Sequence, residues 1–206
     1  MRVDAEVDSA VDPRLLLRTL EEECCAVPAD VAGRLGVDED HVHAGLDGLE
    51  RSGFVRRDGD GVYRLPPESA GELRELYVVA ILLEGLALRG APPFDDARLD
   101  AVRAANARLR AATDTAAAVA ADDEFHRTLV EASANTRLRA THAQCKAALL
   151  RYEFHYFFDA ARVERSACQH DAVVAALEAG DNDAAAAAVR ANFEDSMPDI
   201  EQDLGG

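Results

Sequence analysis

The sequence predicts a mainly α-helical protein with an N-terminal winged helix-turn-helix and a C-terminal antiparallel six-helix bundle. Apolar residues recur at helical spacing along most of the chain, which indicates amphipathic helices. A hairpin signal lies within residues 54–65, and the double proline Pro66-Pro67 follows it directly. We therefore expect two domains, residues 1–66 and residues 67–206, joined at the double proline.

The N-terminal domain is expected to begin with three helices. Pro13 opens the segment PRLLLRTLEEECC, in which leucines recur at helical spacing. A short second helix is expected to end at Gly36, because glycine permits the backbone of a tight turn. In the third helix, the spacing of Val42, Leu46 and Leu49 places them on one face. Two short helices joined by a tight turn predict a helix-turn-helix.

A β-hairpin is expected directly after the third helix. Residues 54–57 and 62–65 have the pattern of strands, and the DG pairs within residues 58–61 favour a tight turn between them. A helix-turn-helix followed by a hairpin predicts a winged helix that binds duplex DNA. The alternative is a three-helix scaffold without a DNA role.

Every segment after the double proline has the pattern of a helix. Breaks are expected where Gly, Pro and Asn gather, as in GAPP at 90–93 and GDN at 180–182. Six helices with short connections predict an antiparallel bundle. The predicted helices span residues 69–90, 95–113, 115–134, 136–160, 162–179 and 182–201.

The charge balance is strongly acidic. The 206 residues include 39 Asp and Glu against 22 Lys and Arg, a net charge of −17, and Lys146 is the chain's single lysine. At molar salt the Debye length is about 3 Å, so the self-repulsion of such a surface is screened. The composition therefore predicts a halophilic protein.

The sequence also predicts a cytoplasmic protein with no membrane partner. No apolar run approaches the roughly 20 residues that are needed to span a bilayer. The N-terminal segment MRVDAEVDSAVD is acidic and lacks the apolar core of a secretory signal.

Three polar residues of the second domain have spacings that suit a metal site. Asp122 and His126 are four residues apart, so both project from one face of a helix. His170 is in phase with Val173, Val174 and Leu177, which indicates that it faces the core. The alternatives are a solvated polar face or a capping interaction for the first pair and a hydrogen-bonded core histidine for His170.

Three segments together resemble the FadR-like C-terminal (FCD) domain of GntR-family regulators. They are LRELYVVAILLEGLAL, DDEFHRTLVEASANTRL and QHDAVVAALEAGDNDAAAAAVRAN, and the resemblance covers residues 70–195. It implies a six-helix bundle with a central pocket, often holding a divalent metal that helps to bind a small organic acid. It also implies that the N-terminal winged helix reads DNA.

The resemblance extends to individual metal ligands. Asp122, His126 and His170 match the aspartate and the first two histidines of the family's site. The fourth ligand is usually a histidine 22 residues after the third, and this chain has Asn192 there. Because an amide oxygen is a weaker donor than imidazole, we expect the site to hold zinc or nickel less tightly.

The effector site is expected to depart from the family as well. Where the family often has an arginine before the Glu of its L-E motif, this chain has Ala80 and Ile81 before Glu84. The predicted effector-binding residues are Glu84 and, from the segment ALLRYEFHYFF, Arg151, Tyr152, His155 and Tyr156. For the last four, an aromatic seam with an exposed arginine is the alternative.

The N-terminal domain is acidic for a DNA-binding domain. Residues 1–66 contain eight arginines and fifteen Asp or Glu, and the third helix opens with Asp38-Glu39-Asp40. Affinity for duplex DNA normally depends on Lys and Arg at phosphates, so we expect base contacts and shape to matter more here. The predicted DNA-binding residues are His41, His43, Arg51, Arg56, Arg57 and Arg64.

The sequence thus predicts a homodimeric, non-enzymatic repressor or activator that binds operator DNA and responds to a small metabolite. One alternative is a ligand-binding adaptor that has lost DNA contact, which the acidic third helix permits. The other is a metal-dependent hydrolase with Glu84 or Glu124 as general base.

Overall fold

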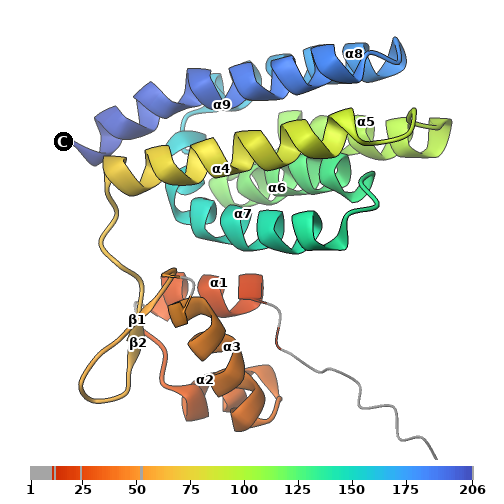
Figure 1. Cartoon of the computed structure of the whole chain (residues 1–206). Coiled ribbons are helices and arrows are strands. Elements are labelled where there is room, and N and C mark those ends of the chain that lie inside the picture. Colours follow the sequence, from red (N-terminus) through yellow and green to blue (C-terminus); the bar gives the residue numbers. More distant parts are fainter. Residues whose placement is uncertain (1–10, 12, 24, 52, 206) are drawn as a thin grey trace, which may run out of the picture. The chain divides into compact units, whose positions relative to one another are not determined.

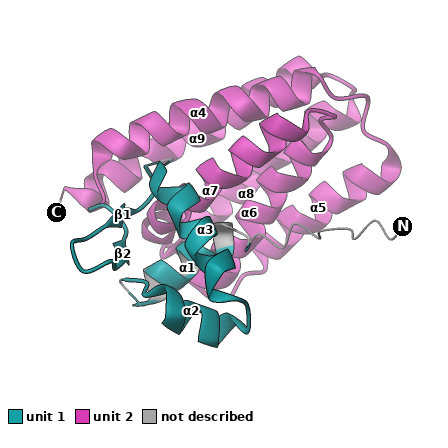
Figure 2. Ribbon diagram, turned by 60° about the horizontal axis from the view of Figure 1, so that its bottom comes forward, with its two compact units in different colours: residues 1–67 teal, residues 68–206 magenta. Residues whose placement is uncertain are grey.

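The structure, a computed structural model, describes residue 11 and residues 13–23, 25–51 and 53–205. The first ten residues of the predicted N-terminal domain therefore lie outside the described part. The chain divides into two compact units, residues 1–67 and residues 68–206 (Figure 2). Each unit has its own core.

The N-terminal unit begins with three helices, α1 (Pro13–Glu23), α2 (Pro28–Leu35) and α3 (Glu39–Arg51). Gly36 ends α2 with φ 68°, and its N–H donates to the carbonyl of Ala32 at 2.9 Å. This left-handed conformation favours glycine, as the sequence predicts. The core of the unit is aliphatic and includes Leu16, Leu20, Val31, Val42, Leu46 and Leu49.

A two-stranded antiparallel sheet, β1 (Arg56–Arg57) and β2 (Tyr63–Arg64), follows α3. The strands are shorter than predicted because the turn begins at Asp58, whose side chain bonds the backbone of the residues that follow. Its carboxylate accepts from the N–H groups of Asp60 at 3.1 Å and Val62 at 3.0 Å. Ala26 and Tyr63 exchange two backbone hydrogen bonds, so β2 is tied to the segment between α1 and α2.

In the C-terminal unit, long helices lie side by side (Figure 1). Those that the structure describes are α4 (Ala70–Arg89), α5 (Asp96–Arg110), α6 (Thr115–Glu131), α7 (Thr136–Phe157), α8 (Ala160–Glu178) and α9 (Asn182–Leu204). Helix α4 packs against α9 and α7, while α5 packs against α6 and α8.

The predicted helices of this unit are found, but three end more than one residue earlier than expected. Helices α5, α6 and α7 end at residues 110, 131 and 157, three residues before the predicted ends. The reason is that Asp114, Asn135 and Asp159 cap the following helices by accepting backbone N–H groups. The residues just before each cap are needed for the connection.

The core of this unit runs along the whole bundle and contains Leu73, Leu109, Phe125, Leu149, Tyr152 and Val173 among many others. It also encloses polar and charged side chains, which form the site described below. No helix among the described residues is both long and apolar enough to cross a membrane.

Candidate functional site

Asp122, His126 and His170 come together in the interior of the C-terminal unit. Asp122 and His126 lie one turn apart on α6, and His170 reaches them from α8. All three are buried, and one donor atom from each lies within 4.8 Å of the others. Asp122 Oδ2 is 3.7 Å from His126 Nε2, and Asp122 Oδ1 is 3.5 Å from His170 Nε2.

The second nitrogen of His126 is held by a buried carboxylate. His126 Nδ1 lies 2.7 Å from Glu84 Oε2, and His142 Nε2 lies 2.8 Å from the other oxygen of Glu84. Burial opposes the charged forms, but the opposite charges outweigh it, so the pKa of His126 is raised and that of Glu84 is lowered. Glu84 thereby orients His126 so that Nε2 faces Asp122.

His170 differs from Asp122 and His126 because its side chain makes no hydrogen bond. It is fully buried, and neither ring nitrogen has a hydrogen-bond partner. Its ring stacks on Phe125 with centroids 3.7 Å apart and an interplanar angle of 1°. Burial lowers the pKa of His170 to about 3, so the imidazole is neutral and offers a lone pair. A buried polar group without a partner is costly, which indicates that this ring binds something else.

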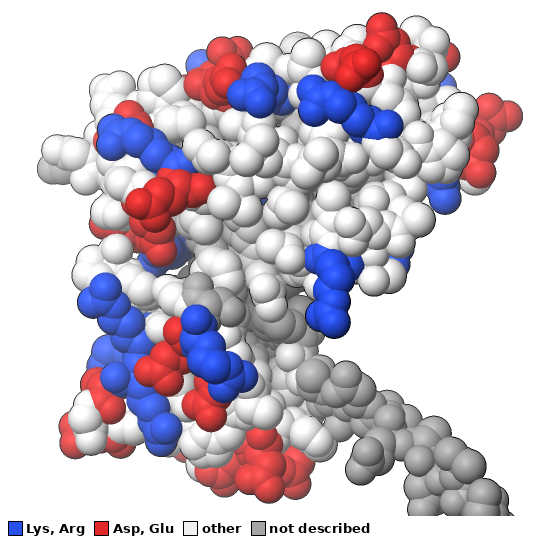
Figure 3. Space-filling model, viewed as in Figure 1, with Lys and Arg blue, Asp and Glu red and all other residues white. Residues whose placement is uncertain are grey.

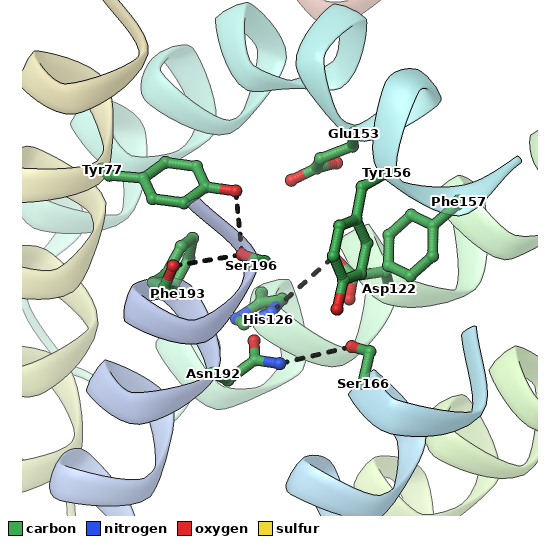
Figure 4. Close-up of a pocket in the computed structure, with 10 residues that line it drawn as sticks. All are labelled: Tyr77, Asp122, His126, Glu153, Tyr156, Phe157, Ser166, Asn192, Phe193 and Ser196. Carbon is green, nitrogen blue, oxygen red and sulfur yellow. Dashed lines mark hydrogen bonds and ion pairs between the residues drawn. The ribbon is translucent and has the colours of Figure 1, made fainter. Parts of the chain in front are cut away.

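Asn192, on α9, borders the same site. Its amide nitrogen donates to Ser166 Oγ at 3.3 Å and to Gln169 Oε1 at 2.9 Å. Figure 4 shows the amide oxygen on the other side of the group, pointing toward His126. The structure therefore brings Asp122, His126 and His170 together, and Asn192 lines the same cavity as Asp122 and His126.

Lys146 and Glu153, both on α7, were not predicted to belong to the site. The ammonium group of Lys146 is fully buried, lies 3.3 Å from Asp122 Oδ2 and donates to Glu153 Oε1. Burial disfavours the ammonium ion, but Glu153 and Asp122 raise the pKa of Lys146 well above its usual range. Burial raises the pKa of Glu153 to about 7.

Two features of the sequence could have predicted that Lys146 and Glu153 belong to the site. Lys146 is the single lysine among arginines, and Glu153 follows it by seven residues, which places both on one face of a helix. His142, four residues before Lys146, lies on the same face and was missed in the same way.

A small cavity of about 20 Å³ opens beside these groups, enough for about one water molecule (Figure 4). Side chains from five helices surround it, and the hydroxyl of Tyr77 points inward and bonds Ser196 Oγ at 3.1 Å. The lining residues are Tyr77, Asp122, His126, Glu153, Tyr156, Phe157, Ser166, Asn192, Phe193 and Ser196.

The predicted effector-binding residues lie in different places. Tyr156 lines the cavity, and Glu84 holds His126. Arg151 and Tyr152 are buried but bond Glu72, and His155, partly exposed, pairs with Glu68 at 2.7 Å. The latter three do not line the cavity.

The predicted DNA-binding residues fall on two elements of the N-terminal unit. His41, His43 and Arg51 belong to α3, where His43 Nε2 lies 3.7 Å from Glu39. Arg56 and Arg57 form β1, and Arg64 is in β2 directly opposite Arg56. The three arginines of the β1–β2 hairpin are exposed, although Arg64 also bonds Asp58 at 3.1 Å. Basic and acidic side chains lie close together on the visible face of this unit (Figure 3).

The residues at the interior site fit a divalent metal. One donor atom from each of Asp122, His126 and His170 lies within 4.8 Å of the others, so the three are close enough to share one ion of the kind that two imidazoles and a carboxylate bind. His170 has no other partner for its nitrogens. Glu84 supplies the carboxylate that typically orients a metal-binding histidine from behind.

Comparison with known proteins identifies the family. Residues 75–195 match the FCD domain family. Among solved structures, McbR/YncC of E. coli has a TM-score of 0.74 at 15% identity, with 93% of this chain and 98% of that chain covered. A putative GntR transcriptional regulator of Rhodococcus sp. RHA1 has a TM-score of 0.66 at 23% identity, covering 88% of this chain and 87% of that one.

A GntR-family transcriptional regulator of Pseudomonas syringae pv. tomato str. DC3000 shows the same fold more distantly. Its TM-score is 0.56 at 20% identity, with 92% of this chain and 83% of that chain covered. The search of curated proteins returned no match. The resemblance predicted from sequence is confirmed: the chain belongs to the FCD domain family and has the fold of GntR-family transcriptional regulators.

Proposed function

We propose that the chain is a homodimeric cytoplasmic transcription regulator that binds operator DNA and senses a small organic acid with the help of a divalent metal. Its N-terminal unit acts as a winged helix-turn-helix, and its C-terminal unit as the sensor. The observation that carries the proposal is His170, whose buried and unpartnered nitrogens lie beside Asp122 and His126 in a bundle of the FCD family.

Asp122, His126 and His170 would hold the metal, with the amide oxygen of Asn192 as a weaker fourth donor. Zinc or nickel suits two imidazoles and a carboxylate. When bound, the metal would supply a positive charge and an open position for an oxygen of the effector. Because Asn192 already bonds Ser166 and Gln169, its oxygen is held in place without the metal.

The cavity must enlarge to admit an organic acid, since about 20 Å³ holds only one water molecule. Helix α9 provides Asn192, Phe193 and Ser196 to the lining, as many residues as α7 does. Movement of this helix would couple effector binding to the rest of the bundle. The response to the effector would then be a change in the spacing of two winged helices, transmitted through Pro66-Pro67.

Helix α4 supports the proposed homodimer. Val78, Leu82 and Leu86 follow one another at four-residue spacing and expose 55%, 53% and 59% of their surface. Glu75 and Arg89 each lie seven residues from Leu82, so two antiparallel copies centred on Leu82 would bring opposite charges together. Such a two-fold pair suits a palindromic operator.

The metal is tested by its content in protein purified in molar salt without chelator. We expect about one zinc or nickel ion per chain, lost in His126→Ala and retained in His155→Ala, a control that removes a partly exposed histidine outside the cavity. Absence of metal from the unmodified protein would refute the metal role. A neutral or aromatic effector near Arg151 and Tyr152 would then be sought.

DNA binding is tested by footprinting the upstream region at molar salt. We expect protection by the unmodified protein and a weaker footprint for Arg56→Ala/Arg64→Ala, with the salt slope reduced by about one per lost phosphate contact. The second candidate is an adaptor without DNA contact, favoured by Glu39 and Asp40 in the first turn of α3. Lack of any footprint, with metal and effector binding intact, would decide for the adaptor.

A further inference from the structure

The single lysine of the chain is buried against a predicted metal ligand. Lys146 is fully enclosed, and its ammonium group lies 3.3 Å from Asp122 Oδ2. This oxygen is the one that lies 3.7 Å from His126 Nε2. A buried ammonium ion is costly unless it is paired, and its two partners here are Asp122 and Glu153.

The site therefore has a positive charge without any metal. Each buried carboxylate already faces a cationic or titratable group: Glu84 faces His126 and His142, and both Asp122 and Glu153 face Lys146. A divalent ion bound to Asp122 would lie within a few ångströms of the ammonium group. Two cations at such a distance in a water-poor interior repel each other strongly.

Resting on the metal role proposed above, we infer that Lys146 is a built-in counter-ion of Asp122 that competes with the divalent metal for this carboxylate. Glu153, which Lys146 already bonds, is the partner that retains the ammonium group when a metal takes Asp122. The native site would then bind metal more weakly than its donor set allows, and loading would shift Lys146 from Asp122 toward Glu153.

The experiment compares two variants that differ only in the ammonium group. Glu153→Gln keeps Lys146 and removes its other partner, whereas Lys146→Met/Glu153→Gln removes both charges and retains the volume of the side chain. Zinc affinity is measured at molar salt by competition with a chromophoric chelator of known affinity. Circular dichroism checks that each variant is helical.

We expect the double variant to bind one zinc ion per chain roughly tenfold or more tightly than Glu153→Gln, because the repulsion is gone. The unmodified protein should fall between them. If Lys146→Met/Glu153→Gln fails to fold, Lys146→Gln/Glu153→Gln replaces it, because two amides can still bond each other.

The outcomes separate this inference from the metal proposal. Equal affinity in all variants would overturn the inference and leave the metal site standing. Zinc binding by the double variant alone would support the inference and refute the metal role in the native protein. No zinc binding in any variant would overturn both.

Discussion

The two units of the chain differ in whether charged side chains lie in the core. In the N-terminal unit, Thr19 is the one buried polar residue among those the structure describes, and the arginines of the β1–β2 hairpin are on the surface. In the C-terminal unit, Glu84, Asp122, Lys146 and Glu153 are all buried, together with three histidines. Both units belong to one strongly acidic chain, so overall composition does not explain the difference.

The difference indicates where each unit can bind a partner. An aliphatic core with charges outside leaves only the surface for recognition, as the proposed DNA binding requires. Burying charges in a core costs desolvation free energy. In a sensor, a ligand or metal that binds these charges can offset that cost. The following predictions test this contrast, from the largest expected effect to the smallest.

Lys146→Ala should lower the free energy of unfolding by about 3–5 kcal/mol, because Asp122 and Glu153 lose their shared cation in a buried place. Denaturant unfolding at molar salt measures this loss. The matched control is Arg190→Ala, which breaks an ion pair with Glu194 on the surface and should cost about 1 kcal/mol or less. Equal losses in the two variants would mean that the buried ion pairs contribute no more to the free energy of unfolding than a surface ion pair.

Leu46→Ala should destabilise the N-terminal unit by about 2–5 kcal/mol, because Leu46 is fully buried in that unit's own core. Hydrogen exchange should accelerate in residues 25–51 and stay unchanged in α4–α9, and the metal content should not fall. Val37→Ala, at a residue that is 39% exposed, is the control. Faster exchange throughout both units would show that they do not fold independently.

Glu84→Gln should weaken the proposed metal binding by about 10–100-fold, because a neutral amide orients and polarises His126 less well than a carboxylate. Titration against a competing chelator measures the change, and Glu131→Gln on the exposed end of α6 is the control. Unaltered affinity in Glu84→Gln would mean that Glu84 serves only to satisfy His126 and His142.

The tyrosines offer a probe that needs no substitution. Burial raises the pKa of Tyr63 and of Tyr152 to about 12, and it also raises the pKa of Tyr77 and Tyr156. An unfolded tyrosine titrates near about 10. The stability that these phenols contribute is therefore complete below about pH 10 and is lost as the pH rises toward about 12.

Absorbance of tyrosinate should accordingly show little ionisation in the folded protein at about pH 10, and a titration near that value in denaturant. Ionisation near pH 10 before the helical signal falls would contradict the burial of all four rings.

The sequence by itself determined the local features. Apolar spacing and chain-breaking residues placed each helix of the C-terminal unit to within a few residues, and the four-residue spacing of Asp122 and His126 put them on one face. Periodicity also predicted the burial of His170, which is confirmed. These features depend on neighbours along one helix, so the sequence contains all the information that they require.

Only the tertiary structure decided which distant groups meet. Glu84 reaches His126 across 42 residues and His142 across 58, and Lys146 lies 24 residues from Asp122. Such pairs join different helices, and the packing of the bundle, not any spacing, brings them together. Buried charges require partners because their desolvation is costly. Which carboxylate pairs with which cation is decided only by the packing of the helices.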